Sequence, residues 1–154
     1  MLLDKNQIYD LVAARFPEDK IPTNSKDKAI WYQDKGIMYK RLGLYQETVE
    51  CYKKSIELIP DNGMVYYNLG KVLYLLDERE KAVRAYTLAL KYNVHIDAYN
   101  CCLHIGHALI DEEPAKIKNY KLSISGKPSD RDFVYDIKCV EAGKKYCNDN
   151  GLKF

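Results

Sequence analysis

The sequence is poor in the residues that interrupt regular structure. Its 154 residues include only 8 glycines and 5 prolines, together about two thirds of average usage. This scarcity argues against disordered, collagen-like and turn-rich all-β classes and favours helices. The 24 basic and 22 acidic residues leave a net charge of only +2. Without a polybasic field, we expect neither a nucleic acid nor an anionic membrane as partner.

The chain also lacks a long hydrophobic run. Asp4 and Lys5 interrupt the N-terminal segment, which predicts neither a secretory signal nor a membrane span, so we expect a cytoplasmic protein. The length suits about one domain. The cysteines are odd in number and follow no disulfide framework, so we expect free thiols: Cys51, Cys101, Cys102, Cys139 and Cys147.

Motifs for phosphate binding, dinucleotide binding, zinc peptidases and serine hydrolases are missing from the sequence. The nearest approach to a metal or catalytic cluster is the stretch from Cys101 to His107 on one expected helix. Ligands on one helix rarely close a tetrahedron, and no second ligand pair occurs elsewhere. A Cys101 nucleophile with His104 as base lacks an anchoring carboxylate. We therefore predict no metal, no cofactor and no enzyme, and keep a Cys/His-dependent enzyme as the weakest alternative.

What the sequence does contain is a period of 34 residues, which divides it into blocks 29–62, 63–96 and 97–130. Each block holds two stretches with apolar residues at helical spacing, separated near its middle, and therefore predicts a helix–turn–helix. Asp77 is a candidate cap for the helix that follows it. The aligned columns include Tyr52, Tyr86 and Tyr120; Leu42, Leu76 and Ile110; Val49, Val83 and Ile117; and Ile56, Leu90 and Ile124.

Glycines recur inside the first helix of the first two blocks, at Gly36 and Gly70. A glycine within a helix costs about 1 kcal/mol relative to alanine. Such a recurrent cost indicates that the two helices of each block touch at this residue. The tyrosine column is expected to belong mostly to the core.

This pattern resembles the tetratricopeptide repeat, which combines an aromatic residue, a Leu-Gly pair and a tyrosine with a second helix containing alanine, an aromatic residue and a closing proline. The third block departs from the pattern at His104 and Lys116. The resemblance implies an all-α superhelix of helix pairs. The first block carries Tyr32, Gly36, Tyr39, Gly43, Tyr45, Tyr52 and Pro60, and the second Tyr66, Leu69, Gly70, Ala82, Tyr86 and Ala89.

Segments 1–24 and 131–154 are expected to flank the repeat region, which we place at 25–130. The N-terminal segment predicts a helix from an Asp4 cap to Phe16 and then a loop, with Ser25 capping the first repeat. Its apolar stripe must fold back on the repeats, pair with another copy in a homodimer, or occupy the groove: Ile8, Leu11, Val12 and Phe16. The C-terminal segment predicts a capping helix that has Ser129 as its N-cap, ends near Gly151 and carries the stripe Phe133, Ile137, Val140 and Cys147.

The family resemblance implies that the first helices of the repeats line a concave groove that holds an extended or helical segment of a client protein. We therefore predict a non-catalytic adaptor or scaffold. A chaperone resembling those for translocator proteins in type III secretion is the alternative, because that class combines an N-terminal helix, three repeats and a C-terminal helix in about this length. The predicted groove residues are Ile37, Met64, Tyr67, Asn68, Lys71, Tyr74, Cys101, Cys102 and Ile105.

Overall fold

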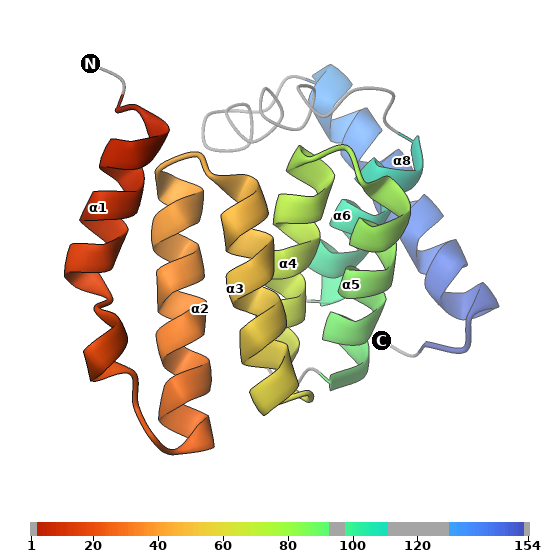
Figure 1. The fold of residues 1–154 in the computed structure, drawn as a ribbon. Coiled ribbons are helices and arrows are strands. Elements are labelled where there is room, and N and C mark those ends of the chain that lie inside the picture. Colours follow the sequence, from red (N-terminus) through yellow and green to blue (C-terminus); the bar gives the residue numbers. More distant parts are fainter. Residues whose placement is uncertain (1–2, 93–97, 111–129, 153–154) are drawn as a thin grey trace.

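The computed structural model describes residues 3–92, 98–110 and 130–152. Within these ranges the regular elements are seven α-helices and one short 3-10 helix, which confirms the all-α class (Figure 1). The elements are α1 (Lys5–Arg15), η1 (Glu18–Lys20), α2 (Ser25–Arg41), α3 (Tyr45–Leu58), α4 (Gly63–Leu75), α5 (Arg79–Tyr92), α6 (Ala98–Ile110) and α8 (Asp130–Asp149).

Helices α2 and α3 form one packed pair and α4 and α5 a second, side by side in Figure 1. The glycines predicted to allow this packing lie at the crossings. A Cβ atom on Gly36 would lie 2.8 Å from a ring carbon of Tyr52, and one on Gly70 would lie 2.7 Å from a ring carbon of Tyr86. Side chains of ordinary size would force the rings away, so the predicted reason for both glycines is confirmed.

The turns inside the two pairs correspond across the 34-residue period. Gly43 ends α2 with φ +86° and Asp77 ends α4 with φ +60°. Around Asp77, its own N–H bonds to the Tyr74 carbonyl and the Glu78 N–H bonds to the Leu73 carbonyl, at 3.0 and 2.9 Å. This is the left-handed C-terminal motif that glycine usually supplies. Asp77 therefore terminates α4, and our interpretation of it as a cap for α5 was wrong.

At the start of α2 the cap is Asn24 and not Ser25. The Asn24 side chain accepts a hydrogen bond from the Asp27 N–H at 2.8 Å, while Ser25 is already the first helical residue. Asparagine and serine are both good N-cap residues, so the sequence predicts the position of the cap only to within one residue. The predicted Asp4 cap of α1 is confirmed and is reinforced by Gln7, whose side chain accepts from the Asp4 N–H.

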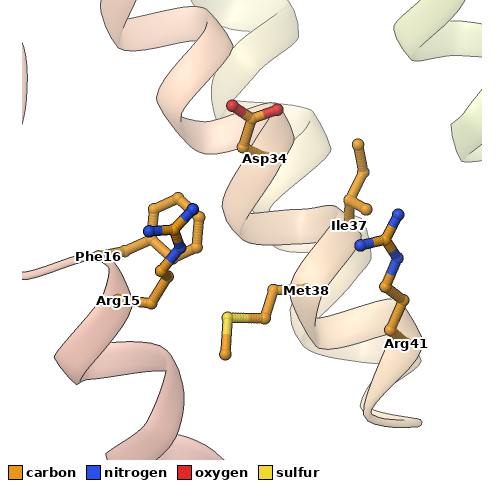
Figure 2. A pocket seen from close by; sticks show the side chains of 6 residues that line it. All are labelled: Arg15, Phe16, Asp34, Ile37, Met38 and Arg41. Carbon is orange, nitrogen blue, oxygen red and sulfur yellow. The ribbon is translucent and has the colours of Figure 1, made fainter.

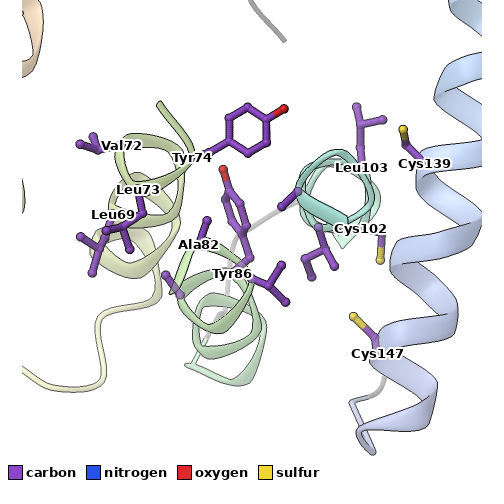
Figure 3. Packing of buried hydrophobic residues seen from close by; sticks show 14 of the residues in the cluster. Leu69, Val72, Leu73, Tyr74, Ala82, Tyr86, Cys102, Leu103, Cys139 and Cys147 are labelled. Atoms are coloured by element: carbon purple, nitrogen blue, oxygen red, sulfur yellow. The ribbon is translucent and has the colours of Figure 1, made fainter. Parts of the chain in front are cut away.

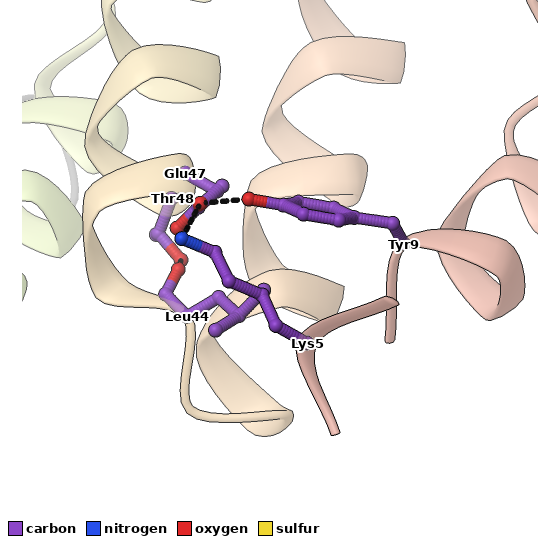
Figure 4. A network of polar contacts seen from close by, with 5 residues as sticks. All are labelled: Lys5, Tyr9, Leu44, Glu47 and Thr48. Atoms are coloured by element: carbon purple, nitrogen blue, oxygen red, sulfur yellow. Dashed lines mark hydrogen bonds and ion pairs between the residues drawn. The ribbon is translucent and has the colours of Figure 1, made fainter. Parts of the chain in front are cut away.

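Helix α1 folds back on the first helix pair. Ile8 and Val12 are buried, whereas Leu11 remains 45% exposed. The Tyr9 hydroxyl donates to Glu47 of α3 at 2.5 Å, and the Lys5 ammonium lies 3.5 Å from the same carboxylate (Figure 4). Most of the predicted stripe is thus covered within the chain.

The carboxylate of Glu47 responds to this docking. Partial burial opposes its ionisation, but the Tyr9 hydrogen bond and the nearby Lys5 charge outweigh that effect, so the pKa of Glu47 is lowered. The ionised carboxylate therefore stabilises the contact between α1 and α3.

Two tyrosines of the predicted column, Tyr52 and Tyr86, are each 1% exposed and belong to the core. Figure 3 shows Tyr86 beside Tyr74, which lies outside the column and is also 1% exposed. Burial raises the pKa of Tyr52 to about 12 and that of Tyr86 well above its usual value. Tyr120, the third member of the column, lies outside the described residues.

Helix α8 packs against α6, backbone to backbone. A Cβ atom on Gly106 would lie 1.8 Å from the Cys139 carbonyl oxygen, and one on Gly143 would lie 2.0 Å from the Cys102 carbonyl oxygen. Each helix thus presents a cysteine and, four residues later, a glycine to the other. Helix α8 is thus a direct packing partner of α6, and its role as the end cap of the repeats stays a prediction.

The expected second helix of block 97–130 falls mainly on residues 111–129, which lie outside the described part, so the three-repeat division stays a prediction. Of the predicted α8 stripe, Val140 and Cys147 are buried, whereas Ile137 is 41% exposed and does not join the core. The side chain of Phe133 lies outside the described residues.

Candidate functional site

One face of α4 holds the best-formed part of the predicted groove. Met64, Tyr67, Asn68 and Lys71 follow one another at helical spacing and therefore share a face. Met64 is 44% exposed, and the other three are partly exposed. The Asn62 side chain fixes the start of this helix by accepting from the Met64 N–H at 3.1 Å. The face combines an exposed thioether, a ring, an amide and an ammonium group.

Tyr67 is held in place by aromatic neighbours. Its ring lies edge-on to Tyr86 at 5.9 Å and to His104 at 5.6 Å, and the Lys71 ammonium lies 5.0 Å from its centroid. The cation–π contact positions a positive charge beside the accessible part of the ring. A partner segment would meet a rigid aromatic surface with a cation at its edge.

Helix α2 contributes Ile37, which lies in a cleft of about 350 Å³ between α1 and α2 (Figure 2). Two guanidinium groups, one carboxylate and three apolar side chains line this cleft. Asp34, Ile37 and Arg41 follow one another at helical spacing on α2 and share a face, but the wall supplied by α1 depends on how that helix docks. The lining residues are Arg15, Phe16, Asp34, Ile37, Met38 and Arg41.

Four predicted groove residues are buried instead of lining an open surface. Tyr74 is 1% exposed, and Cys101, Cys102 and Ile105 are each 0% exposed. Tyr74 packs in the core beneath the Arg79 guanidinium, whose carbon lies 6.0 Å from its ring centroid. These four side chains cannot be contacted by a ligand without opening the core, and we correct the prediction accordingly.

The register of α6 explains the errors in the third block. The glycine that faces the partner helix is Gly106, 36 residues after Gly70, whereas a 34-residue period places His104 there. His104 instead stacks on Tyr86 of α5 at 5.4 Å. A shift of two residues turns a helix by more than half a revolution. Residues extrapolated from α4 to α6 therefore point to other neighbours.

The cysteines and histidines of α6 do not converge on one point. Cys101 packs with Tyr66 and Ala89, whereas Cys102 lies within hydrogen-bonding reach of Cys147 on α8. Burial raises the pKa of the Cys102 thiol and raises that of Cys147 to about 12. An activated nucleophile needs the opposite shift. Across the described ranges, no group of three or more His, Cys, Asp or Glu side chains is placed to hold a metal ion.

The sequence analysis missed the contact between α6 and α8. The sequence feature that could have predicted it is a cysteine followed four residues later by a glycine. This spacing occurs at Cys102 and Gly106 and again at Cys139 and Gly143, and in each case it puts two small residues on one helix face. Small residues four apart let helix backbones approach closely. The spacing alone did not say which helices would meet.

Comparison with protein families supports the repeat assignment. A model described as TPR repeat matches residues 36–77, and one described as tetratricopeptide repeat matches residues 65–93. A comparison with curated proteins finds no significant match. Among the described residues, no helix has the length and apolar character needed to cross a membrane. The matched segments contain both glycine crossings, and residues 36–93 of this chain form tetratricopeptide repeats.

Proposed function

We propose that the chain is a non-catalytic adaptor that binds an extended or helical segment of a client protein on the accessible face of α4 and the neighbouring part of α2. Tetratricopeptide repeats generally mediate protein–protein interactions. The single observation that carries the proposal is the group of Met64, Tyr67, Asn68 and Lys71, which presents apolar area, amide hydrogen bonding and one positive charge on one surface. Ile37, which lines the cleft beside α1, is the residue that we propose α2 contributes to client binding.

Each group on this face has a role in recognising a segment. Asn68 supplies both a donor and an acceptor for a peptide backbone. Tyr67 supplies contact area with little rotamer entropy to lose, because its neighbours already hold the ring. Lys71 favours an acidic residue in the client, through a contact that salt weakens.

The alternative is a chaperone of the type that shields secreted translocator proteins. The order of an N-terminal helix, paired helices and the C-terminal α8 is compatible with it. A Cys/His-dependent enzyme is disfavoured because Cys101 and Cys102 are fully buried. Identification of the client separates the first two: a secreted, membrane-inserting client favours the chaperone, and any other client favours the general adaptor.

The test is capture of the client by the tagged full-length chain, followed by mass spectrometry and titration with the purified client. The variant combines Asn68→Ala with Lys71→Glu, because Tyr67 packs on the core and its truncation would leave a gap. The matched control makes the same two kinds of change on the exposed side of α3, Gln46→Ala with Lys53→Glu. We expect binding to be lost in the first variant and kept in the control, with unchanged helicity in both. The reverse result would refute the proposal.

A further inference from the structure

A second pocket of about 390 Å³ lies apart from the face on α4. Three helices build it, the consecutive α5 and α6 and the later α8, and none of its lining residues belongs to the proposed client surface. Helix α5 provides its first two turns, α6 its last turn and α8 a single aromatic side chain. The lining residues are Arg79, Glu80, Val83, Arg84, Ala108, Leu109 and Tyr146.

The base of the pocket is apolar. Val83 and Ala108 are each 5% exposed and belong to the core, whereas Leu109 is 47% exposed. Tyr146 of α8 is partly buried against the same core. An exposed leucine beside an apolar base gains free energy when a second apolar group covers it. The pocket therefore suits a large aliphatic or aromatic side chain.

The rim carries two guanidinium groups, those of Arg79 and Arg84, and the carboxylate of Glu80. The Arg79 Nε lies 3.2 Å from an Asp77 carboxylate oxygen, and its guanidinium stacks near Tyr74, which fixes the side chain. The Arg79 Nη2 atom is shielded and finds no hydrogen-bond acceptor among the described residues. Arg79 thus keeps donor capacity that an entering carboxylate can use.

Arg84 is exposed and makes no ion pair within the described ranges. It follows Glu80 by four residues on α5, so both side chains stand on the same helix face. Asp77 pairs with Arg79 from outside the lining, so the rim offers guanidinium groups as hydrogen-bond donors and not an excess of positive charge.

We infer that this pocket binds a short segment of a partner protein in which a large apolar side chain stands next to an acidic one. The volume lies at the small end of ligand pockets and suits one or two side chains better than a cofactor. The apolar base takes the first group, and Arg79 and Arg84 pair with the second. The site is a second contact surface, independent of the face on α4.

The test follows the backbone amide resonances of the isotope-labelled full-length chain during titration with defined peptides. The probe is acetyl-Gly-Gly-Asp-Leu-Phe-Asp-Gly-Gly-amide. In one matched peptide lysine replaces both aspartates, and in the other serine replaces leucine and phenylalanine. We expect only the probe to shift the amides of Val83, Arg84, Ala108, Leu109 and Tyr146 in a saturable way. If the lysine or the serine peptide binds there equally well, the inference is wrong.

Two variants test the pocket without disturbing the core. Leu109→Glu and Arg84→Glu change exposed side chains, and each should weaken probe binding about tenfold. Their matched controls are Leu11→Glu on α1 and Lys26→Glu on α2, exposed residues that line neither site and should leave the affinity unchanged. Equal loss in the controls overturns the assignment.

The Asn68→Ala, Lys71→Glu variant distinguishes this inference from the proposed function. It should bind the probe normally even where client binding is lost. Probe-induced shifts confined to α4 would overturn the inference while favouring the client surface. If the probe peptide binds normally and the α4 variant also binds the client as well as the parent does, the proposed function is refuted and the inference stands.

Discussion

Replacement of Gly106 or Gly143 by alanine should force α6 and α8 apart. In both cases the new Cβ atom meets backbone of the opposite helix, at 1.8 Å from the Cys139 oxygen and 2.0 Å from the Cys102 oxygen. Backbone atoms cannot rotate away as a side chain can. Ordinary contact between heavy atoms begins well above 3 Å, so the helices must separate by more than about 1 Å at the crossing.

The magnitude follows from the contacts that such a separation removes. A radial gap of about 0.5–1 Å forfeits a quarter to a half of each dispersion contact, and overpacking generally costs about 1–3 kcal/mol and occasionally more. Against this cost, alanine stabilises a helix by about 1 kcal/mol relative to glycine. Because the new Cβ atom meets backbone in both variants, we take an overpacking cost above the usual range, about 3–4 kcal/mol, and expect a net loss of about 2–3 kcal/mol of unfolding free energy. Gly36→Ala and Gly70→Ala meet only tyrosine ring atoms at 2.7–2.9 Å, and should lose about 0–2 kcal/mol.

The assay is urea unfolding of the full-length chain followed by far-ultraviolet circular dichroism. Lys144→Ala, next to Gly143 on the exposed side of α8, is the control and should stay within about 0.5 kcal/mol of the parent. The double variant Gly106→Ala, Gly143→Ala should lose less than the sum of the single losses, because the first alanine already separates the helices. A gain of stability in either single variant would refute the backbone contact. If the double variant loses the full sum of the two single losses, the two glycines do not belong to the same helix contact.

Three further predictions concern turns and titration. Asp77→Gly should stabilise the chain by about 1 kcal/mol and Gly43→Ala should destabilise it by a similar amount, because both positions have positive φ; thermal unfolding measures both. The folded-state pKa of Tyr52 is raised from 10.0 to about 12. The contribution of the neutral phenol to the unfolding free energy is therefore complete below pH 10 and is lost between pH 10 and 12. In Tyr52→Phe the loss of stability at alkaline pH should be smaller. The pKa of Glu47 is lowered from 4.5, so the contribution of its carboxylate to the unfolding free energy is present above pH 4.5 and is lost as the pH falls through the folded-state pKa. Tyr9→Phe should lower the unfolding free energy by about 1 kcal/mol at neutral pH and reduce its dependence on acid pH, as measured by urea unfolding at a series of pH values.

Much of the fold could be predicted because its determinants are local and repeated. Helices α2 to α5 follow from apolar spacing within 34 residues, and Gly36 and Gly70 reveal the contact inside each pair because a helical glycine needs a reason. The Asp4 cap of α1 and the end of α8 near Gly151 follow from nearest-neighbour chemistry in the same way. These features were determined by the sequence itself.

Only the tertiary structure decided the candidate sites. Cys102 and Ile105 align with accessible positions of α4, but α6 is turned by the backbone contact between Gly106 and α8, which buries them. The pocket beside Leu109 needs three helices, and the cleft beside Ile37 needs the docking of α1. A periodic pattern specifies which face of a helix is apolar. Which neighbour covers that face depends on contacts between distant segments, and these appear only when the helices have packed.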